Sequence, residues 1–153
     1  MSTPSETKEL IRHIMGAQRF AVLATMSDQQ PYSNLVAFAV SDDLRHIVFA
    51  TNRNTQKYRN ILLYDRVALL IDTRSNNLSD FIEALAITTL GIAGELTGDE
   101  SDKLGQSYLN RYPSLGEFLQ RPDIVIISVL VTDYILARFY GAERIRIDSI
   151  SSL

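Results

Sequence analysis

The feature that most constrains the fold is a series of short apolar, β-branched runs separated by polar turns. Most of these runs follow one another without a helical crossover, which predicts a mainly antiparallel sheet. Six to seven such strands with even turn signals favour a small β-barrel or sandwich with peripheral helices. The expected strands are residues 20–25, 32–40, 46–51, 66–72, 84–96, 124–131 and 134–140.

Helices are expected at residues 4–17, 55–64, 97–110 and 114–120. The first and third begin with the pattern of a capping box, in which a threonine is followed three residues later by a glutamate. Gly91 and Gly94 lie inside an expected strand and predict a bulge, a bend or a close approach of another backbone. The 153 residues suit a single domain over 1–153.

Composition excludes several classes of protein. With 46% hydrophobic and 22% charged residues, the chain is typical of a soluble globular protein. Its net charge of −3 disfavours nucleic-acid binding. The absence of cysteine excludes disulfides, thiolate metal sites and a cysteine nucleophile. No apolar run approaches ~20 residues and the N-terminus lacks a hydrophobic signal segment, so we expect a cytoplasmic protein without a membrane partner.

Few side chains have the spacing of a known catalytic or metal site. His13 and His46 are isolated, so we expect surface positions and no metal site. Ser33 and Ser128 lack the G-x-S-x-G context of a hydrolase. No catalytic residue can therefore be named. Aromatic residues in the last third are expected in the core or an interface; they are Tyr108, Tyr112, Phe118, Phe139 and Tyr140.

Residues 49–72 carry the strongest functional signal: a strand, the polar turn 52–57, a short helix and a second strand. A helix start offers free backbone N–H groups and favours negative charge. With nearby hydroxyls and cations, the arrangement predicts a phosphate site. The alternative is that Asn54 or Thr55 simply caps the helix and the cations are solvated. On the pattern alone, that alternative is the more common outcome.

Three segments together resemble a known family. F-A-T-N-R-N-T-Q-K-Y-R-N-I is followed at short spacing by D-R-V-A-L-L-I-D and preceded by P-Y-S-N-L-V-A-F-A-V. Their order and spacing resemble the pyridoxamine 5′-phosphate oxidase-like flavoproteins over residues 20–96, and more weakly to residue 140. The resemblance implies an antiparallel split β-barrel, and a homodimer with FMN at the interface. It also favours the phosphate site over simple capping.

The resemblance implies which residues hold the cofactor. The turn matches the segment that holds the FMN phosphate, and the backbone of residues 34–36 would face the flavin ring. Thr89 falls near a position where the oxidase has an amide side chain in contact with the flavin. The expected cofactor-binding residues are Ser33, Asn34, Leu35, Val36, Thr51, Asn52, Arg53, Thr55, Gln56, Lys57 and Thr89.

The chain departs from the true oxidase in three ways. Gln56 stands where the oxidase has an arginine, and Arg53 is the nearby residue that would replace this charge. Thr89 replaces the amide. The C-terminal segment lacks the tryptophan-containing region and the Arg-His signature used near the pyridoxal substrate. The resemblance therefore implies FMN but not this substrate.

We expect an FMN-dependent oxidoreductase that acts on an unidentified small molecule. One alternative is a deazaflavin-dependent reductase, or a reductase of nitro or quinone compounds. Another is a non-catalytic flavin or haem binding protein, because P-Y-S-N-L-V and T-x-K-x-x-N are similar to segments of haem-utilisation relatives of this fold. Neither histidine lies in a C-terminal extension, which argues against haem.

Overall fold

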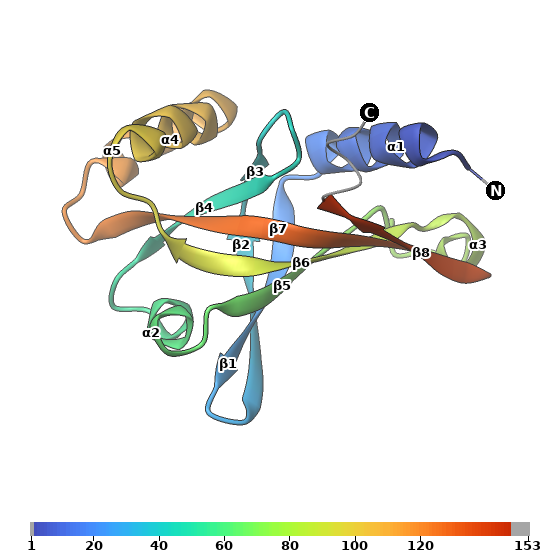
Figure 1. Cartoon of the computed structure of the whole chain (residues 1–153), viewed down its shortest axis with the longest axis horizontal. Coiled ribbons are helices and arrows are strands. Elements are labelled where there is room, and N and C mark those ends of the chain that lie inside the picture. The colour runs from blue at the N-terminus through green and yellow to red at the C-terminus, as the bar shows by residue number, and fades with distance from the viewer. Residues whose placement is uncertain (1, 148–153) are drawn as a thin grey trace.

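The computed structural model describes residues 2–147 and contains one eight-stranded antiparallel sheet (Figure 1). The strand order is β2-β1-β5-β6-β7-β4-β3, and β8 pairs with β7. The strands are β1 (Phe20–Ser27), β2 (Gln30–Ala37), β3 (Ala39–Val40), β4 (His46–Asn52), β5 (Arg66–Asp72), β6 (Ala86–Glu95), β7 (Ile124–Arg138) and β8 (Gly141–Arg146). The helices are α1 (Pro4–Ala17), α2 (Gln56–Leu63), α3 (Asp80–Glu83), α4 (Asp99–Arg111), the 3-10 turn η1 (Pro113–Leu115) and α5 (Gly116–Leu119).

The sheet curls because its two ends are consecutive in the chain. β2 pairs with β1 and β3 pairs with β4, and only Phe38 separates β2 from β3. The single strand expected over 32–40 is therefore two strands that serve opposite ends of the sheet. Phe38 at this corner is fully buried. The expectation of an antiparallel split barrel is confirmed, with eight strands rather than six or seven.

β7 was expected as two strands with a turn at Thr132-Asp133, and this expectation is wrong. β7 runs without interruption, and its pairing with β6 shifts register between Leu90 and Gly91. A Cβ on Gly91 would lie 2.5 Å from Val129 Cγ1 and 2.6 Å from the Leu130 carbonyl oxygen. The extra residue of this bulge is Thr132 of β7, which lies opposite Leu90 and Gly91, so the bulge is in the partner strand and not in β6. The expected close approach is present at Gly91, where only glycine fits.

The main core lies inside the curl and is closed at one end by α1. Leu23, Leu69 and Ile127 are fully buried on the inner face, and Ile11 and Met15 of α1 pack onto them as part of one cluster. The first expected capping box is confirmed, since the side chains of Thr3 and Glu6 each bond the other's backbone N–H. The second is wrong: α4 begins after Gly98, at φ +74°, without a side-chain cap.

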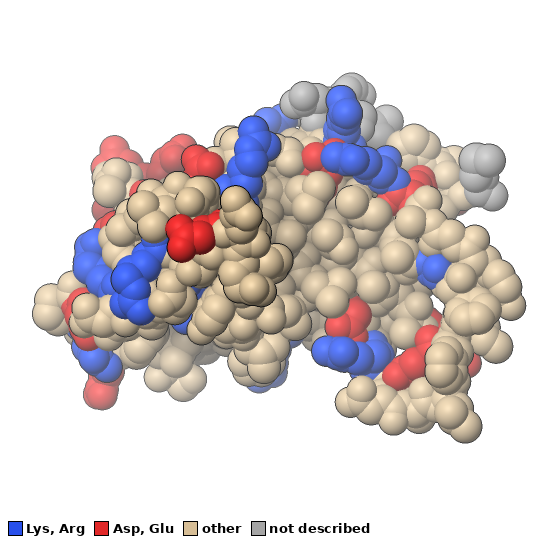
Figure 2. Space-filling view, turned by 90° about the horizontal axis from the view of Figure 1, so that it is seen from below, with Lys and Arg blue, Asp and Glu red and all other residues tan. Residues whose placement is uncertain are grey.

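The outer face of the sheet is covered on one half only. α4 packs over β3, β4 and the first part of β7, where the Tyr108 hydroxyl donates to the Ala37 carbonyl. The other half, over β2, β1, β5 and β6, has no helix over it within residues 2–147 (Figure 1). Its apolar side chains are exposed, among them Phe20, Leu35, Leu70 and Ile92. In the view from below, a broad uncharged area separates the charged groups at the two ends (Figure 2).

Candidate functional site

The site expected from the sequence lies where β4 ends and α2 begins. α2 packs against β1, beside the β1–β2 hairpin (Figure 1). A buried hydrogen bond fixes this contact, since Asn60 Nδ2 donates to Thr25 Oγ1 at 2.9 Å. Tyr58 and Ile61 are also buried on this face of the helix. The middle of α2 is therefore held against β1, at the level of the first residues of β2.

No side chain among residues 2–147 caps the first turn of α2. Thr55 is the N-cap residue, but its side chain does not bond to a backbone N–H of the helix. Its hydroxyl instead donates to the Asn52 carbonyl at 2.8 Å and lies 3.1 Å from Thr51 Oγ1. The alternative that Thr55 simply caps the helix is therefore wrong. Asn54 also leaves the helix start uncapped, so its first N–H groups keep their capacity for an anion.

The turn before α2 is anchored to the residue that precedes β7. Asn52 Nδ2 donates to Asp123 Oδ2 at 2.6 Å, and the Arg53 N–H donates to the Asp123 carbonyl at 2.9 Å. Asn52 Oδ1 accepts the Asn54 N–H at 2.8 Å. Both the nitrogen and the oxygen of the Asn52 side-chain amide therefore have partners within the protein. Asn52 therefore shapes the turn rather than pointing an unused group at a ligand.

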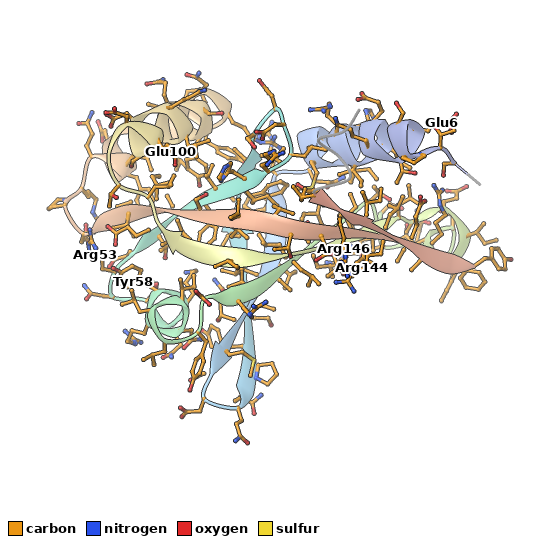
Figure 3. The ribbon with its side chains drawn as sticks, viewed as in Figure 1. Glu6, Arg53, Tyr58, Glu100, Arg144 and Arg146 are labelled. Atoms are coloured by element: carbon orange, nitrogen blue, oxygen red, sulfur yellow. The ribbon has the colours of Figure 1, made fainter. Side chains whose placement is uncertain are left out.

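Arg53 is paired with a carboxylate from another strand. Its two terminal nitrogens lie 2.7 and 2.9 Å from the Glu95 oxygens, a bidentate pair at the end of β6. The Tyr58 hydroxyl accepts from Arg53 at 3.0 Å and donates to Glu95 at 2.9 Å. Figure 3 shows Arg53 and Tyr58 at the same corner of the molecule. The hydrogen bonds from Arg53 lower the pKa of Glu95. Arg53 therefore does not offer the free charge that would replace an arginine at position 56.

Gln56 is also committed to neighbours within α2. Its Nε2 donates to Asn60 Oδ1 at 2.7 Å, and its Oε1 accepts from Arg59 at 3.1 Å. These hydrogen bonds hold the Gln56 side chain against α2. The backbone N–H of Gln56 is still one of the uncapped groups of the first turn.

Lys57 is the free cation of this region. Its side chain is half-buried, and no hydrogen-bond or ion-pair partner for it exists among residues 2–147. Burial lowers the pKa of the ammonium group, because the charged form loses solvent without gaining a counter-charge. A half-buried, unpaired cation at an uncapped helix start is an incomplete electrostatic arrangement that an anion would complete.

The expected ring-facing strand lies at the edge of the sheet. β2 is an end strand and pairs only with β1, so alternate backbone groups point away from the sheet. Asn34 Oδ1 is buried and has no partner in the described chain. Ser33 and Leu35 are exposed on the outer face, whereas Val36 is buried on the inner face. This edge of the sheet thus has backbone N–H and C=O groups that pair with no strand, and beside them the Asn34 side-chain oxygen without a hydrogen-bond partner among residues 2–147.

Thr89 is placed differently from the other expected residues. Asn34, Leu23, Leu69 and Thr89 are successive partners across four strands, so all four share the inner face. Thr89 is fully buried there, and its hydroxyl has no partner within residues 2–147. Its side chain therefore lies inside the barrel. The expected contact of Thr89 with a flavin ring edge stays a prediction.

Comparison with known proteins now decides the family. The family profile described as pyridoxamine 5′-phosphate oxidase matches residues 5–131. The chain belongs to the pyridoxamine 5′-phosphate oxidase family. The match includes β2, the turn 52–57 and α2, so every expected site residue lies inside the family region. No curated protein matches the chain significantly in sequence.

Several solved structures share the fold. A heme binding protein from Mycobacterium smegmatis has a TM-score of 0.84 at 18% identity, covering 99% of this chain and 62% of that one. The chain therefore spans less than two thirds of that protein. General Stress Protein 26 from Bacillus anthracis str. Sterne has a TM-score of 0.69 at 25% identity, covering 92% and 98%. A FAD-binding protein from Mesorhizobium loti has a TM-score of 0.65 at 19% identity, covering 83% and 89%.

Other candidate features of this family member are weaker. His13 is exposed, and His46 Nδ1 lies 3.2 Å from Ser128 Oγ at the far end of β4. Residues 2–147 contain no cluster of three or more histidine or acidic side chains that could hold a metal. None of the helices described is long and apolar enough to cross a membrane. Of the expected aromatic residues, Tyr108 is buried, whereas Phe139 and Tyr140 are exposed.

Sequence reasoning missed the residues that hold the turn. Glu95, Asp123 and Tyr58 contact it directly, yet none was singled out. Glu95 and Asp123 are 42 and 71 residues from their partners, so no local spacing links them. The only available signal was an acidic residue at the end of an expected strand, which is common on protein surfaces.

Proposed function

We propose that this chain binds FMN with its phosphate at the start of α2 and acts as an FMN-dependent oxidoreductase on an unidentified small molecule. The observation that carries the proposal is Lys57, a half-buried cation without a partner among residues 2–147. It lies in the first turn of a helix that has no side-chain cap. A phosphate monoester supplies the missing counter-charge and acceptors for the free N–H groups.

The residues of the site have separate roles in this proposal. Lys57 and the N–H groups of α2 hold the phosphate, and the hydroxyls of Thr51 and Thr55 turn toward it from their bonds with each other and with the Asn52 carbonyl. Asn52 and Arg53 shape the turn through Asp123 and Glu95. The free edge of β2, over residues 33–36, lies along the ring. When bound, the flavin supplies hydride transfer, and the protein positions it.

The proposal includes a homodimer with the cofactor at the interface. The uncovered outer face of the sheet exposes apolar side chains, including Leu35 at 67% and Phe20 at 62%. Leu35, Val22 and Leu70 are partners across three strands, so they form one row on this face. A second copy that packs here removes this area from water and excludes water from the ring. The absence of cysteine is compatible with the cytoplasm, which we include in the proposal.

A haem binding function is the second candidate. It is favoured by the overall similarity to the heme binding protein from M. smegmatis. The position of the histidines favours flavin instead, since His13 lies on α1 and His46 lies at the opposite end of β4 from the α2 site. A deazaflavin with a phosphate-bearing side chain is the closest alternative to FMN, since it would use the same anion site.

The test is to identify the ligand of the purified protein by absorbance and mass. Flavin-type absorbance, with the mass of FMN, and its bleaching by NADH or NADPH support the proposal. A Soret band supports haem, and the mass of a deazaflavin supports that cofactor instead. A colourless protein that does not bind added FMN would refute flavin binding altogether.

A further inference from the structure

We propose that Arg59 is the second cation of the anion site at the start of α2 and binds the phosphate together with Lys57. The cation expected to help Lys57 was Arg53, but the structure pairs Arg53 with Glu95. The inference rests on the proposed flavin function for the identity of the ligand, because it concerns the phosphate of FMN. Arg59 was not among the expected cofactor-binding residues.

The Arg59 side chain folds back toward the start of its own helix. Its Nη1 donates to the carbonyl of Asn54, which lies before the N-cap residue of α2, at 3.1 Å. Its Nη2 donates to Gln56 Oε1, on the first residue of α2, at 3.1 Å. The guanidinium is therefore held beside the first turn of the helix, although its backbone is further along the chain.

The glutamine that holds this guanidinium is itself anchored in the protein interior. Gln56 Nε2 donates to Asn60 Oδ1 at 2.7 Å, and Asn60 Nδ2 donates to Thr25 Oγ1 at 2.9 Å. Asn60 and Thr25 are each only 2% exposed. This chain of hydrogen bonds keeps the Gln56 oxygen available to Arg59, so the cation is positioned before any ligand binds.

Free backbone donors lie next to the guanidinium. The first hydrogen bond of helical spacing in α2 runs from the Arg59 N–H to the Thr55 carbonyl at 3.2 Å. The N–H groups of residues 56–58 come before it and have no acceptor within residues 2–147. Such groups at a helix start favour an anion. An anion bound there meets the guanidinium at the same turn.

The charges of α2 are arranged against its dipole. Its two charged side chains, Lys57 and Arg59, both lie in the first turn, and no acidic side chain accompanies them there. Neither forms an ion pair with a carboxylate in the described part of the chain. Cations are unfavourable at a helix start unless an anion is bound. Together with about half a charge from the helix, they match a phosphate monoester of about −1.5 to −2.

A purely structural role of Arg59 makes a different prediction. If its hydrogen bonds only stabilise the turn, Arg59→Gln lowers the stability of the ligand-free protein and leaves the affinity for FMN intact. If Arg59 binds the phosphate, Arg59→Gln weakens FMN but not riboflavin. The ligand-free protein then keeps its stability, because removal of a cation from the helix start offsets the lost hydrogen bonds.

The experiment measures FMN and riboflavin binding by calorimetry in wild type, Arg59→Gln and Arg59→Lys. Urea unfolding without ligand gives the stability of each variant, and thermal unfolding with inorganic phosphate tests the site without the ring. Arg45→Gln is the matched control, since it removes an exposed arginine just before β4, at the opposite end of that strand from the turn. Arg59→Ala takes the place of Arg59→Gln if the glutamine variant does not fold.

We expect Arg59→Gln to bind FMN about fivefold more weakly than wild type, and Arg59→Lys less than threefold more weakly, because lysine keeps the charge. Riboflavin affinity and ligand-free stability should not change, and Arg45→Gln should behave like wild type. An unchanged FMN affinity in folded Arg59→Gln, a loss that riboflavin shares, or an equal loss in Arg59→Lys would overturn the inference while leaving FMN binding intact.

The phosphate measurement separates failure of the inference from failure of the proposed function. If wild type binds no FMN but is stabilised by phosphate, and Arg59→Gln loses this stabilisation, the proposed function is refuted and the role of Arg59 in an anion site is supported. A protein that binds no FMN, and whose response to phosphate is absent or the same in Arg59→Gln, would refute both.

Discussion

At the scale of single residues, the account depends on the contrast between Lys57 and Arg53. Both were expected at the phosphate from their place in the turn. The position of Lys57 followed from local spacing, because Lys57 is the second residue of α2 and is therefore fixed by the start of the helix. The partner of Arg53 did not, since Glu95 is 42 residues away and only the barrel brings them together. The place of each cation in the turn could therefore be predicted from the sequence, but the carboxylate that pairs with Arg53 could not.

The half-buried Lys57 should make the ligand-free protein less stable than it would be with an apolar side chain. Its pKa is lowered by burial from an ordinary value of 10.5, so the folded state binds fewer protons than the unfolded state between these two pKa values. Stability of wild type should rise with pH across that window. Lys57→Met, which lacks this group, should be more stable than wild type at neutral pH and lose the advantage toward pH 10.

Urea unfolding of both proteins without ligand, from pH 7 to 10, measures this difference. Lys103→Met is the control, because it makes the same substitution at an exposed lysine on α4. Parallel stability curves for wild type and Lys57→Met would contradict the account of an unpaired buried cation.

At the scale of elements, the sequence correctly predicted antiparallel strands, but it did not predict where two of those strands divide or continue. Alternation and turn residues predicted nearly every strand, because each needs only local signals. They could not predict that residues 32–40 divide at Phe38, since the division follows from pairing with β1 and β4 at opposite ends of the sheet. They also placed a turn at Thr132-Asp133, where β7 instead continues through a bulge at Thr132. Long-range pairing decided both cases.

The two glycines of β6 give a matched test of the close approach between β6 and β7 beside this bulge. Gly91→Ala should lower the free energy of unfolding by about 1–3 kcal/mol, because the new methyl group meets Val129 and the Leu130 carbonyl. Gly94→Ala should be neutral or slightly stabilising, since no atom lies within 4 Å of its added Cβ. Denaturant unfolding of both variants checks the difference. Equal effects would show that the close packing at Gly91 does not restrict the sheet.

At the scale of the whole molecule, the uneven covering of the sheet determines how the protein is expected to assemble. α4 shields one half of the outer face and leaves the apolar row of Leu35, Val22 and Leu70 exposed. The sequence predicted an apolar last third, but the exposed row lies in the first half of the chain. Which face stays open depends on where α4 packs, and that follows from contacts distant in sequence.

Charges placed on this row should separate the proposed dimer. Leu35→Glu or Leu70→Glu puts an unpaired charge into the interface, which costs about 3–5 kcal/mol and raises the dimer dissociation constant more than 100-fold. Light scattering after size exclusion measures the change. Leu78→Glu, at an exposed position before α3, should remain dimeric. A dimer that survives both interface variants would place the contact elsewhere.

The central claim is that the flavin is anchored through its phosphate at Lys57. The most direct measurement is the affinity of the protein for FMN and for riboflavin, which differ only in the phosphate. We predict that riboflavin binds at least 100-fold more weakly, and that Lys57→Met weakens FMN by about 1.5–3 kcal/mol while leaving riboflavin unchanged. Equal affinities for the two flavins, or an FMN affinity that Lys57→Met does not alter, would contradict the account.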